Sequence, residues 1–243
     1  MGAAGPLIRV RGLVKDFPLG AQRVRALAGV DLDVAEGDFV VVMGPSGSGK
    51  STLLNLVGGL DRPTGGSIEV EGRDIARLDE IGLADFRREM IGFVFQSFNL
   101  VPTMTARQNV EFPLVFAGAP PARRRARAEA LLAEVGLGHR VEHRPTELSG
   151  GEQQRVAIAR AMANAPRIIL GDEPTGNLDT RTGEEVLALL GDLNRGGSTV
   201  LVVTHDARLA GYADRVFHMQ DGRILRHEPG ARVRAALSAG SPS

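Results

Sequence analysis

The chain has 243 residues, of which 43% are hydrophobic and 24% charged, as in ordinary globular proteins. Its 29 basic and 29 acidic side chains cancel, so no global field favours nucleic acid as a partner. It has no cysteine, which excludes disulfides and thiolate metal sites. No apolar run approaches the ~20 residues of a membrane helix, and the N-terminus lacks a signal-peptide pattern. We therefore expect a chain that stays where it is translated, with any membrane spanning done by another polypeptide.

Strands and helices alternate along the chain and predict an α/β fold with a mainly parallel sheet. The expected strands cover residues 7–17, 26–34, 39–43, 67–70, 91–96, 167–170, 199–203, 216–219 and 223–225, and the expected helices cover 52–60, 83–90, 122–135, 151–164 and 182–193. The first strands form a strand-rich layer, and a hairpin connection is expected over residues 19–25.

We expect one domain over residues 1–228, with a core at about 1–90 and 165–226. The mostly helical segment of about 97–164 interrupts the sheet and is interpreted as an inserted subdomain. Residues 229–243, rich in alanine, glycine, arginine and serine, are expected to be a flexible tail.

The most informative stretch is a glycine-rich loop between the apolar run 39–43 and the helical pattern 52–60. The loop reads Gly44, Pro45, Ser46, Gly47, Ser48, Gly49, Lys50, Ser51, Thr52. Strand, glycine-rich loop and helix are the context of a P-loop, whose backbone N–H groups cradle phosphates. We predict that Lys50 reaches the β- and γ-phosphates and that Ser51 ligates Mg²⁺.

The use of lysine supports this prediction over a chance glycine-rich turn. Among the 29 basic residues only Lys15 and Lys50 are lysine. A compact ammonium group fits a phosphate cradle, and a planar guanidinium does not replace it.

A second feature of a nucleotide site is a pair of acids after a buried strand. Asp172 and Glu173 follow the apolar residues 167–170. At a strand end Asp172 can hold Mg²⁺, and Glu173 can polarise the attacking water. Alone, the pair could also be a helix entry with Pro174, but the upstream P-loop favours the catalytic interpretation.

Phenylalanine is concentrated between residues 86 and 116, which hold six of the nine. Some of these side chains must belong to the core, and so dense a cluster also suggests a docking surface. A basic run, Arg123 to Arg125 with Arg127, is interpreted as a solvated helix face, with an anionic membrane surface as the alternative.

A third stretch opens a helix with Leu148, Ser149, Gly150, Gly151 and Glu152. Serine and glycines at a helix N-terminus form another anion site. The chain then has one phosphate-binding helix start more than its own nucleotide needs.

This stretch, followed by Gln153, Gln154 and Arg155, resembles the signature motif of ABC transporter ATP-binding subunits. The resemblance extends in order over about residues 7–226. The matching motifs are Walker A at 44–52, the Q-loop glutamine Gln96, the signature at 148–152, Walker B at 168–172 with Glu173, the D-loop ending at Asp179 and the switch histidine His205. Glu152 stands where glutamine is commoner, and Gly171 where alanine is frequent.

The resemblance implies a P-loop NTPase fold with a RecA-like core and an ATPase reaction. It implies a dimer, in which each ATP lies between one P-loop and the partner's Ser149 and Gly151. Glu173 would be the catalytic base, and His205 would contact the γ-phosphate. Gln96 would touch Mg²⁺ and couple the site to the inserted lobe, and Phe17 would stack on adenine.

Finer cues, above all residues 176–179 and Asn99 with Leu100, are most similar to the lipoprotein-releasing and macrolide-exporter group. Such a subunit would sit on the cytoplasmic face of the inner membrane, and its Phe-rich lobe would receive a membrane permease. Three alternatives stay open: a signalling or cell-division ATPase, an importer ATPase, and a soluble ABC ATPase acting on DNA or ribosomes.

Overall fold

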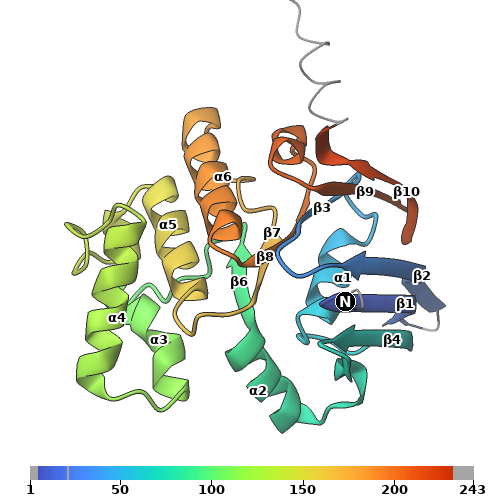
Figure 1. Cartoon of the computed structure of the whole chain (residues 1–243), viewed down its shortest axis with the longest axis horizontal. Helices are drawn as coiled ribbons and strands as arrows, with labels where there is room; N and C mark the ends of the chain where they lie inside the picture. Colours follow the sequence, from blue (N-terminus) through green and yellow to red (C-terminus); the bar gives the residue numbers. More distant parts are fainter. Residues whose placement is uncertain (1–4, 21, 232–243) are drawn as a thin grey trace, which may run out of the picture.

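A six-stranded sheet runs through the middle of the molecule in this computed structural model, which describes residues 5–20 and 22–231 (Figure 1). The strand order is β10-β9-β3-β8-β7-β6. The strands are β3 (Phe39–Met43), β6 (Ile91–Phe95), β7 (Ile168–Asp172), β8 (Thr199–Thr204), β9 (Arg215–Gln220) and β10 (Arg223–Pro229). All neighbours pair in parallel except β10, which is antiparallel to β9. The predicted mainly parallel sheet is therefore confirmed.

The sheet is buried on both faces, which explains why its central strands are apolar without alternation. In β3, Val40 and Val42 belong to the core on one face, whereas Phe39 and Val41 belong to the core on the other. All four are fully buried. Each such side chain contributes about 1.5–3 kcal/mol to folding. This rigid two-sided packing fixes the ends of the strands, from which the functional loops leave.

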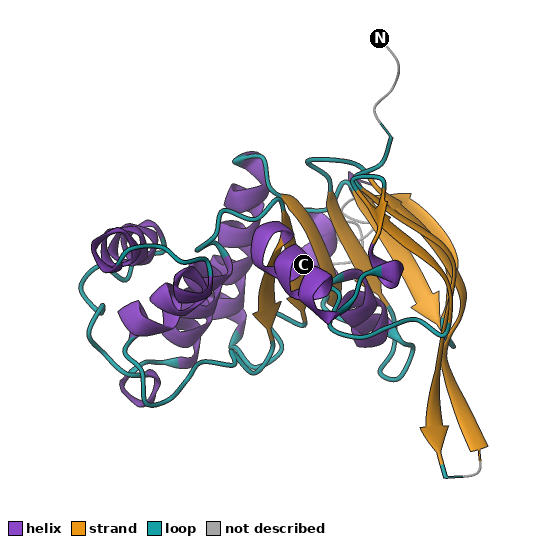
Figure 2. Cartoon of the chain, turned by 90° about the horizontal axis from the view of Figure 1, so that it is seen from below, coloured by secondary structure: helices purple, strands orange, loops and turns teal. Residues whose placement is uncertain are grey.

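The predicted antiparallel layer is a second sheet with the order β2-β1-β4-β5. Its strands are β1 (Ile8–Leu19), β2 (Gln22–Val34), β4 (Gly65–Val70) and β5 (Arg73–Asp74). The predicted hairpin is present, but its connection is shorter than residues 19–25, because Leu19 already pairs with Gln22. The two strands continue past the apolar residues as a two-stranded arm (Figure 2). Polar residues such as Arg23 and Arg25 are compatible with strands there, because both faces of the arm are exposed.

Helices fill the space beside the parallel sheet. Helices α1 (Lys50–Val57) and α2 (Glu80–Met90) follow the P-loop strand, and α6 (Thr180–Arg195) precedes β8. Short 3₁₀ turns cover η1 (Ile75–Arg77), η2 (Pro145–Glu147) and η3 (Ala207–Gly211). None of the helices in the described part of the chain is both long and apolar enough to cross a membrane.

Three helices form a lobe with its own core: α3 (Ala106–Phe116), α4 (Pro121–Glu134) and α5 (Gly150–Ala161). Leu131, Leu132 and Val156 are fully buried there. The sequence analysis did not identify α3. A capping box in which Thr105 and Gln108 satisfy each other's backbone N–H groups starts this helix. In Figure 1 the lobe lies on the opposite side of the sheet from α1.

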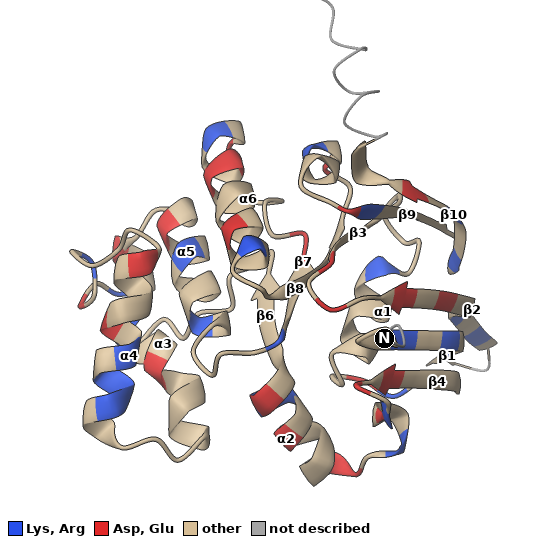
Figure 3. Ribbon diagram, viewed as in Figure 1, with Lys and Arg blue, Asp and Glu red and all other residues tan. Residues whose placement is uncertain are grey.

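The last strand corrects the predicted tail. β10 extends to Pro229 and pairs it with Arg215, so the ordered fold continues past residue 228. The predicted tail covered residues 229–243, of which 232–243 lie outside the described residues. The surface helices α4, α5 and α6 each carry both basic and acidic side chains (Figure 3).

Candidate nucleotide-binding site

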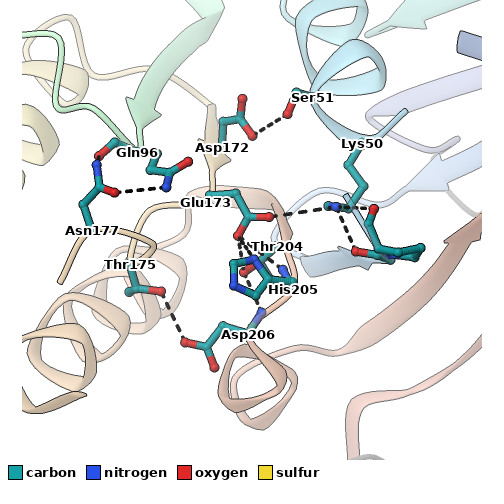
Figure 4. A network of polar contacts seen from close by, with 12 residues as sticks. Lys50, Ser51, Gln96, Asp172, Glu173, Thr175, Asn177, Thr204, His205 and Asp206 are labelled. Atoms are coloured by element: carbon teal, nitrogen blue, oxygen red, sulfur yellow. Dashed lines mark hydrogen bonds and ion pairs between the residues drawn. The ribbon is translucent and has the colours of Figure 1, made fainter. Parts of the chain in front are cut away.

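Four parallel strands end at one edge of the sheet, and each is followed by a polar residue of the predicted site. The P-loop follows β3, Gln96 follows β6, and Glu173 and His205 follow β7 and β8. The carboxyl ends of parallel strands form the binding crevice in such sheets. Figure 4 shows these side chains gathered around Glu173.

The loop after β3 has the shape of a phosphate cradle. Gly47 and Gly49 have backbone φ values of 78° and 100°, which residues other than glycine rarely adopt. A Cβ on Gly44 would lie 2.1 Å from the carbonyl oxygen of Met219. The buried hydroxyl of Ser48 has no hydrogen-bond partner among the residues that the structure describes. Gly44 lets the loop pack closely on β9, while the positive φ values and the Ser48 hydroxyl fit an anion that approaches the loop backbone.

Lys50 is held in the cradle although it carries a charge. Its side chain is only 7% exposed, and its Nζ donates to the carbonyls of Gly44 (2.8 Å) and Pro45 (3.0 Å). The same Nζ lies 3.9 Å from Oε1 of Glu173. The ammonium group therefore sits between the loop and the acid that follows β7.

A hydroxyl and a carboxylate meet beside Lys50. Ser51 Oγ donates to Asp172 Oδ1 over 2.8 Å. Burial raises the pKa of Asp172 despite this hydrogen bond. Both are oxygen ligands of the kind Mg²⁺ prefers. Within residues 5–20 and 22–231 no three His, Asp or Glu side chains could hold a metal by themselves, so this pair needs further oxygens from a phosphate chain.

Glu173 is oriented by β8 and the residues that follow it. Its Oε2 accepts hydrogen bonds from Thr204 Oγ1 (3.0 Å) and from the backbone N–H of His205 (3.2 Å). His205 Nδ1 lies 2.9 Å from the same oxygen. The backbone of Glu173 has a φ of 47°, which is a strained value for glutamate. The carboxylate is thus fixed in one direction, as a general base must be.

Gln96 contacts a residue that the sequence analysis used only as a subgroup cue. Its Nε2 donates to Asn177 Oδ1 (3.1 Å), and Asn177 Nδ2 donates to the Gln96 carbonyl (3.0 Å). A Cβ on Gly176 would lie 2.7 Å from Gln96 Nε2. Two hydrogen bonds between Gln96 and Asn177 therefore connect the predicted Q-loop to the predicted D-loop.

The signature residues stand apart from the P-loop of the same chain. Ser149 caps α5 and accepts from Glu152 N, while Glu152 accepts from Ser149 N (2.8 Å). This second bond lowers the pKa of Glu152. Helices α1 and α5 lie on opposite sides of β6 and β7 in Figure 1. One chain does not bring together the two helix starts that are predicted to bind anions.

Two more predicted residues have contacts of their own. Phe17 on β1 is 39% exposed, and the Nζ of Lys15 lies 4.9 Å from its ring centre. Asp179 caps α6 by accepting from the backbone N–H of Thr182 (3.1 Å).

Comparison with known proteins decides the family. A family profile described as ABC transporter matches residues 27–176, more than half of the chain. The chain belongs to the ABC transporter family. It is the ATP-binding and hydrolysing domain of that family, as the sequence motifs predicted.

Among curated relatives, the chain is 54% identical over 220 residues to a macrolide export ATP-binding/permease protein MacB of Paracoccus denitrificans. That match covers 90% of this chain but 33% of the relative, so the chain spans about a third of such relatives. An uncharacterized ABC transporter ATP-binding protein of Thermotoga maritima is 53% identical, and the match covers 86% of this chain and 90% of that protein.

A solved structure supports the fold and the reaction. The dimeric ATP-binding cassette MJ0796, in a post-hydrolysis state with ADP and phosphate, superposes with a TM-score of 0.86 at 46% identity. The match covers 91% of this chain and 98% of that one. The α/β P-loop fold is confirmed.

Proposed function

We propose that this ATPase domain powers export of a substrate through a membrane permease, on the cytoplasmic face of the inner membrane. The convergence of Lys50, Ser51 and Glu173 at one edge of the sheet carries the proposal. The MacB relatives, which are macrolide export proteins, support a macrolide-like or lipoprotein cargo. From the sequence analysis we keep a single domain with a helical subdomain at about 97–164, and we extend the domain to at least Pro229, where β10 ends.

The chemistry assigned to the site is attack of a water on the γ-phosphorus of ATP. A P–O bond to the water oxygen forms, the bond to the β–γ bridging oxygen breaks, and Glu173 takes the proton. Lys50 and the P-loop amides stabilise charge on the phosphates. When bound, Mg²⁺ supplies neutralising charge, and Ser51, Asp172 and Gln96 would hold it. His205 keeps Glu173 aimed through its Nδ1.

We assign the second anion site to the partner of a homodimer. Ser149 and Gly151 lie at the start of α5, a helix on the other side of β6 and β7 from α1 in Figure 1, and MJ0796 is a dimeric cassette. Two chains related by a twofold axis can place each signature over the other's P-loop. Filling both sites with ATP then closes the dimer, and hydrolysis reopens it.

The permease contact is assigned to a groove beside β6. The groove, of about 340 Å³, is lined by residues that include Phe93, Phe95, Phe116, Arg87 and Arg160. Phe116 is 66% exposed. By contrast Phe86, another member of the Phe-rich segment, is buried in the core, so that segment supplies both core and surface.

Purification from membranes tests the proposal. The wild-type chain should retain a membrane permease, and Phe116→Ser should lose it while keeping the same melting temperature. Reconstitution in vesicles should then show ATP-dependent release of a hydrophobic cargo. ATPase activity without any transport would favour the signalling role instead, and absence of ATPase activity from the full complex would contradict the proposal.

A further inference from the structure

A chain of polar contacts leads from Glu173 to residues with no role in the scheme above. Thr204 Oγ1 donates to Glu173 Oε2 (3.0 Å) and accepts from the backbone N–H of Asp206 (2.9 Å). Thr204 is fully buried. The Asp206 carboxylate in turn accepts from Thr175 Oγ1 over 3.3 Å (Figure 4). The position of Asp206 therefore bears on the base through a buried hydroxyl.

Arg208 continues the chain of contacts. Its Nε and Nη2 donate to Asp206, at 3.0 and 2.6 Å. Although burial acts to raise it, the pKa of Asp206 lies below its ordinary value because Arg208 donates to it. The pair is charged at neutral pH, and a bidentate guanidinium–carboxylate pair has fixed geometry.

The remaining nitrogen of Arg208 reaches a different element. Nη1 donates to the carbonyl of Thr180 (3.2 Å), the first residue of α6. A Cβ on Gly183 in the same turn would lie 3.4 Å from Arg208 Nη2. The absent side chain at Gly183 leaves room for the guanidinium against α6.

The same turn of α6 touches the signature. A Cβ on Gly151 would lie 2.1 Å from Thr182 Cγ2, so the start of α5 packs directly on this turn. The first turn of α6 thus contacts the signature loop through Thr182, and through the Thr180 carbonyl it contacts Arg208, which Asp206 and Thr204 link to Glu173.

We propose that Arg208, paired with Asp206, is a positioning residue that ties Glu173 to the first turn of α6 and thereby to the signature loop. The inference rests on the proposed function, in which Glu173 is the base. In the dimer assigned above, the signature of a chain completes one ATP site and its Glu173 serves the other. Arg208 then makes the aim of the base in one site depend on the signature contact made in the other.

The test measures the steady-state ATPase activity of the wild-type chain and of three variants: Arg208→Gln, Arg208→Lys and the control Arg181→Gln. Arg181 lies on the same turn of α6, its side chain is 91% exposed, and its ion pair in the described part of the chain is with Glu185. Misplacing a catalytic group costs up to about 100-fold. We expect Arg208→Gln to lower kcat about 10-fold with KM for ATP unchanged within about twofold, and Arg181→Gln to change neither.

A double-mutant cycle separates positioning from general destabilisation. Thr204→Val removes the hydroxyl through which Arg208 acts. If Arg208 works through Thr204, the double variant loses about as much kcat as either single variant; independent effects would multiply. Should Arg208→Gln fail to fold, Arg208→Lys, which keeps the charge beside Asp206, takes its place in the cycle.

A kcat at the wild-type level, an equal loss in Arg181→Gln, or multiplicative losses in the cycle would each overturn the inference. An inactive wild-type chain would instead count against the proposed function.

Discussion

The carboxylate of Glu173 and the ring of His205 are joined, with His205 Nδ1 2.9 Å from Glu173 Oε2. The backbone N–H of His205 donates to the same oxygen. The other oxygen, Oε1, faces Lys50. The two residues that the motif order assigned to catalysis are therefore one hydrogen-bonded unit, in which His205 fixes the direction of the acid.

Replacing the base should stop the chemistry and leave nucleotide binding intact. In Glu173→Gln the amide cannot take a proton from water, and we expect kcat to fall about 10²- to 10⁴-fold. Binding of a fluorescent ATP analogue should stay within about twofold of wild type, because the P-loop is unchanged. The matched control is Glu184→Gln on the exposed side of α6. Activity above a tenth of wild type in Glu173→Gln would remove Glu173 from this role.

The packing of Gly151 against Thr182 predicts a rescue. Gly151→Ala places a methyl group 2.1 Å from Thr182 Cγ2, and we expect a loss of about 1–3 kcal/mol in urea unfolding. Adding Thr182→Ser removes Cγ2, so that the nearest remaining atom is Cβ at 3.5 Å. The double variant should regain most of the stability. Equal stability of the single and double variants would show that the contact is not the cause.

The local parts of the site could be predicted from sequence. The apolar strand, the glycine-rich loop and Lys50 are contiguous, so spacing alone places them. The position of Asp172 and Glu173 also follows, because a buried strand leads directly into them. The contact of Gln96 with Asn177, and the contacts that join Thr204 to Glu173 and Arg208 to Thr180, depend on how separate segments are placed, which no single segment encodes.

Two errors in the fold have physical causes. Pro113 lies inside α3, near its end, and together with Pro102 it obscured a helix that the Thr105 and Gln108 capping box marks. The arm formed by β1 and β2 has no buried face, so its polar residues gave no alternation from which to infer strands.

The signature helix predicts a pH dependence. Because the Ser149 N–H donates to Glu152, the pKa of that carboxyl lies below its ordinary 4.5. A group with a lowered pKa stabilises the fold above the ordinary value, and the contribution disappears as the pH falls through the folded value. We expect the free energy of unfolding of Glu152→Gln to be about 0.3–1 kcal/mol below that of the wild type at pH 7 and equal to it in acid.

Thermal melts from pH 7 into acid check this expectation. The control is Glu129→Gln, which removes an exposed ion pair with Arg125 and should have little effect at any pH. A stability gap for Glu152→Gln that grows as the pH falls would have the wrong sign for a lowered pKa.

Two substitutions separate the capping role of Ser149 from its role toward a partner. Ser149→Ala removes the cap of α5 and should cost about 1 kcal/mol, whereas aspartate at this position keeps the cap. Both should bind ATP at their own P-loop and fail to associate with a second chain, the aspartate because it repels the γ-phosphate. If two Ser149→Asp chains still associate when ATP is present, the signature does not contact the γ-phosphate.

The central claim is that ATP joins two chains by bridging the P-loop of one to the signature of the other. Light-scattering mass measurement of Glu173→Gln, with and without saturating ATP and Mg²⁺, tests it most directly. We predict a monomer without ATP, a dimer with ATP, and a monomer with ATP once Ser149→Asp is added. A Glu173→Gln protein that binds ATP and stays monomeric, or a dimer that survives Ser149→Asp, would contradict the account.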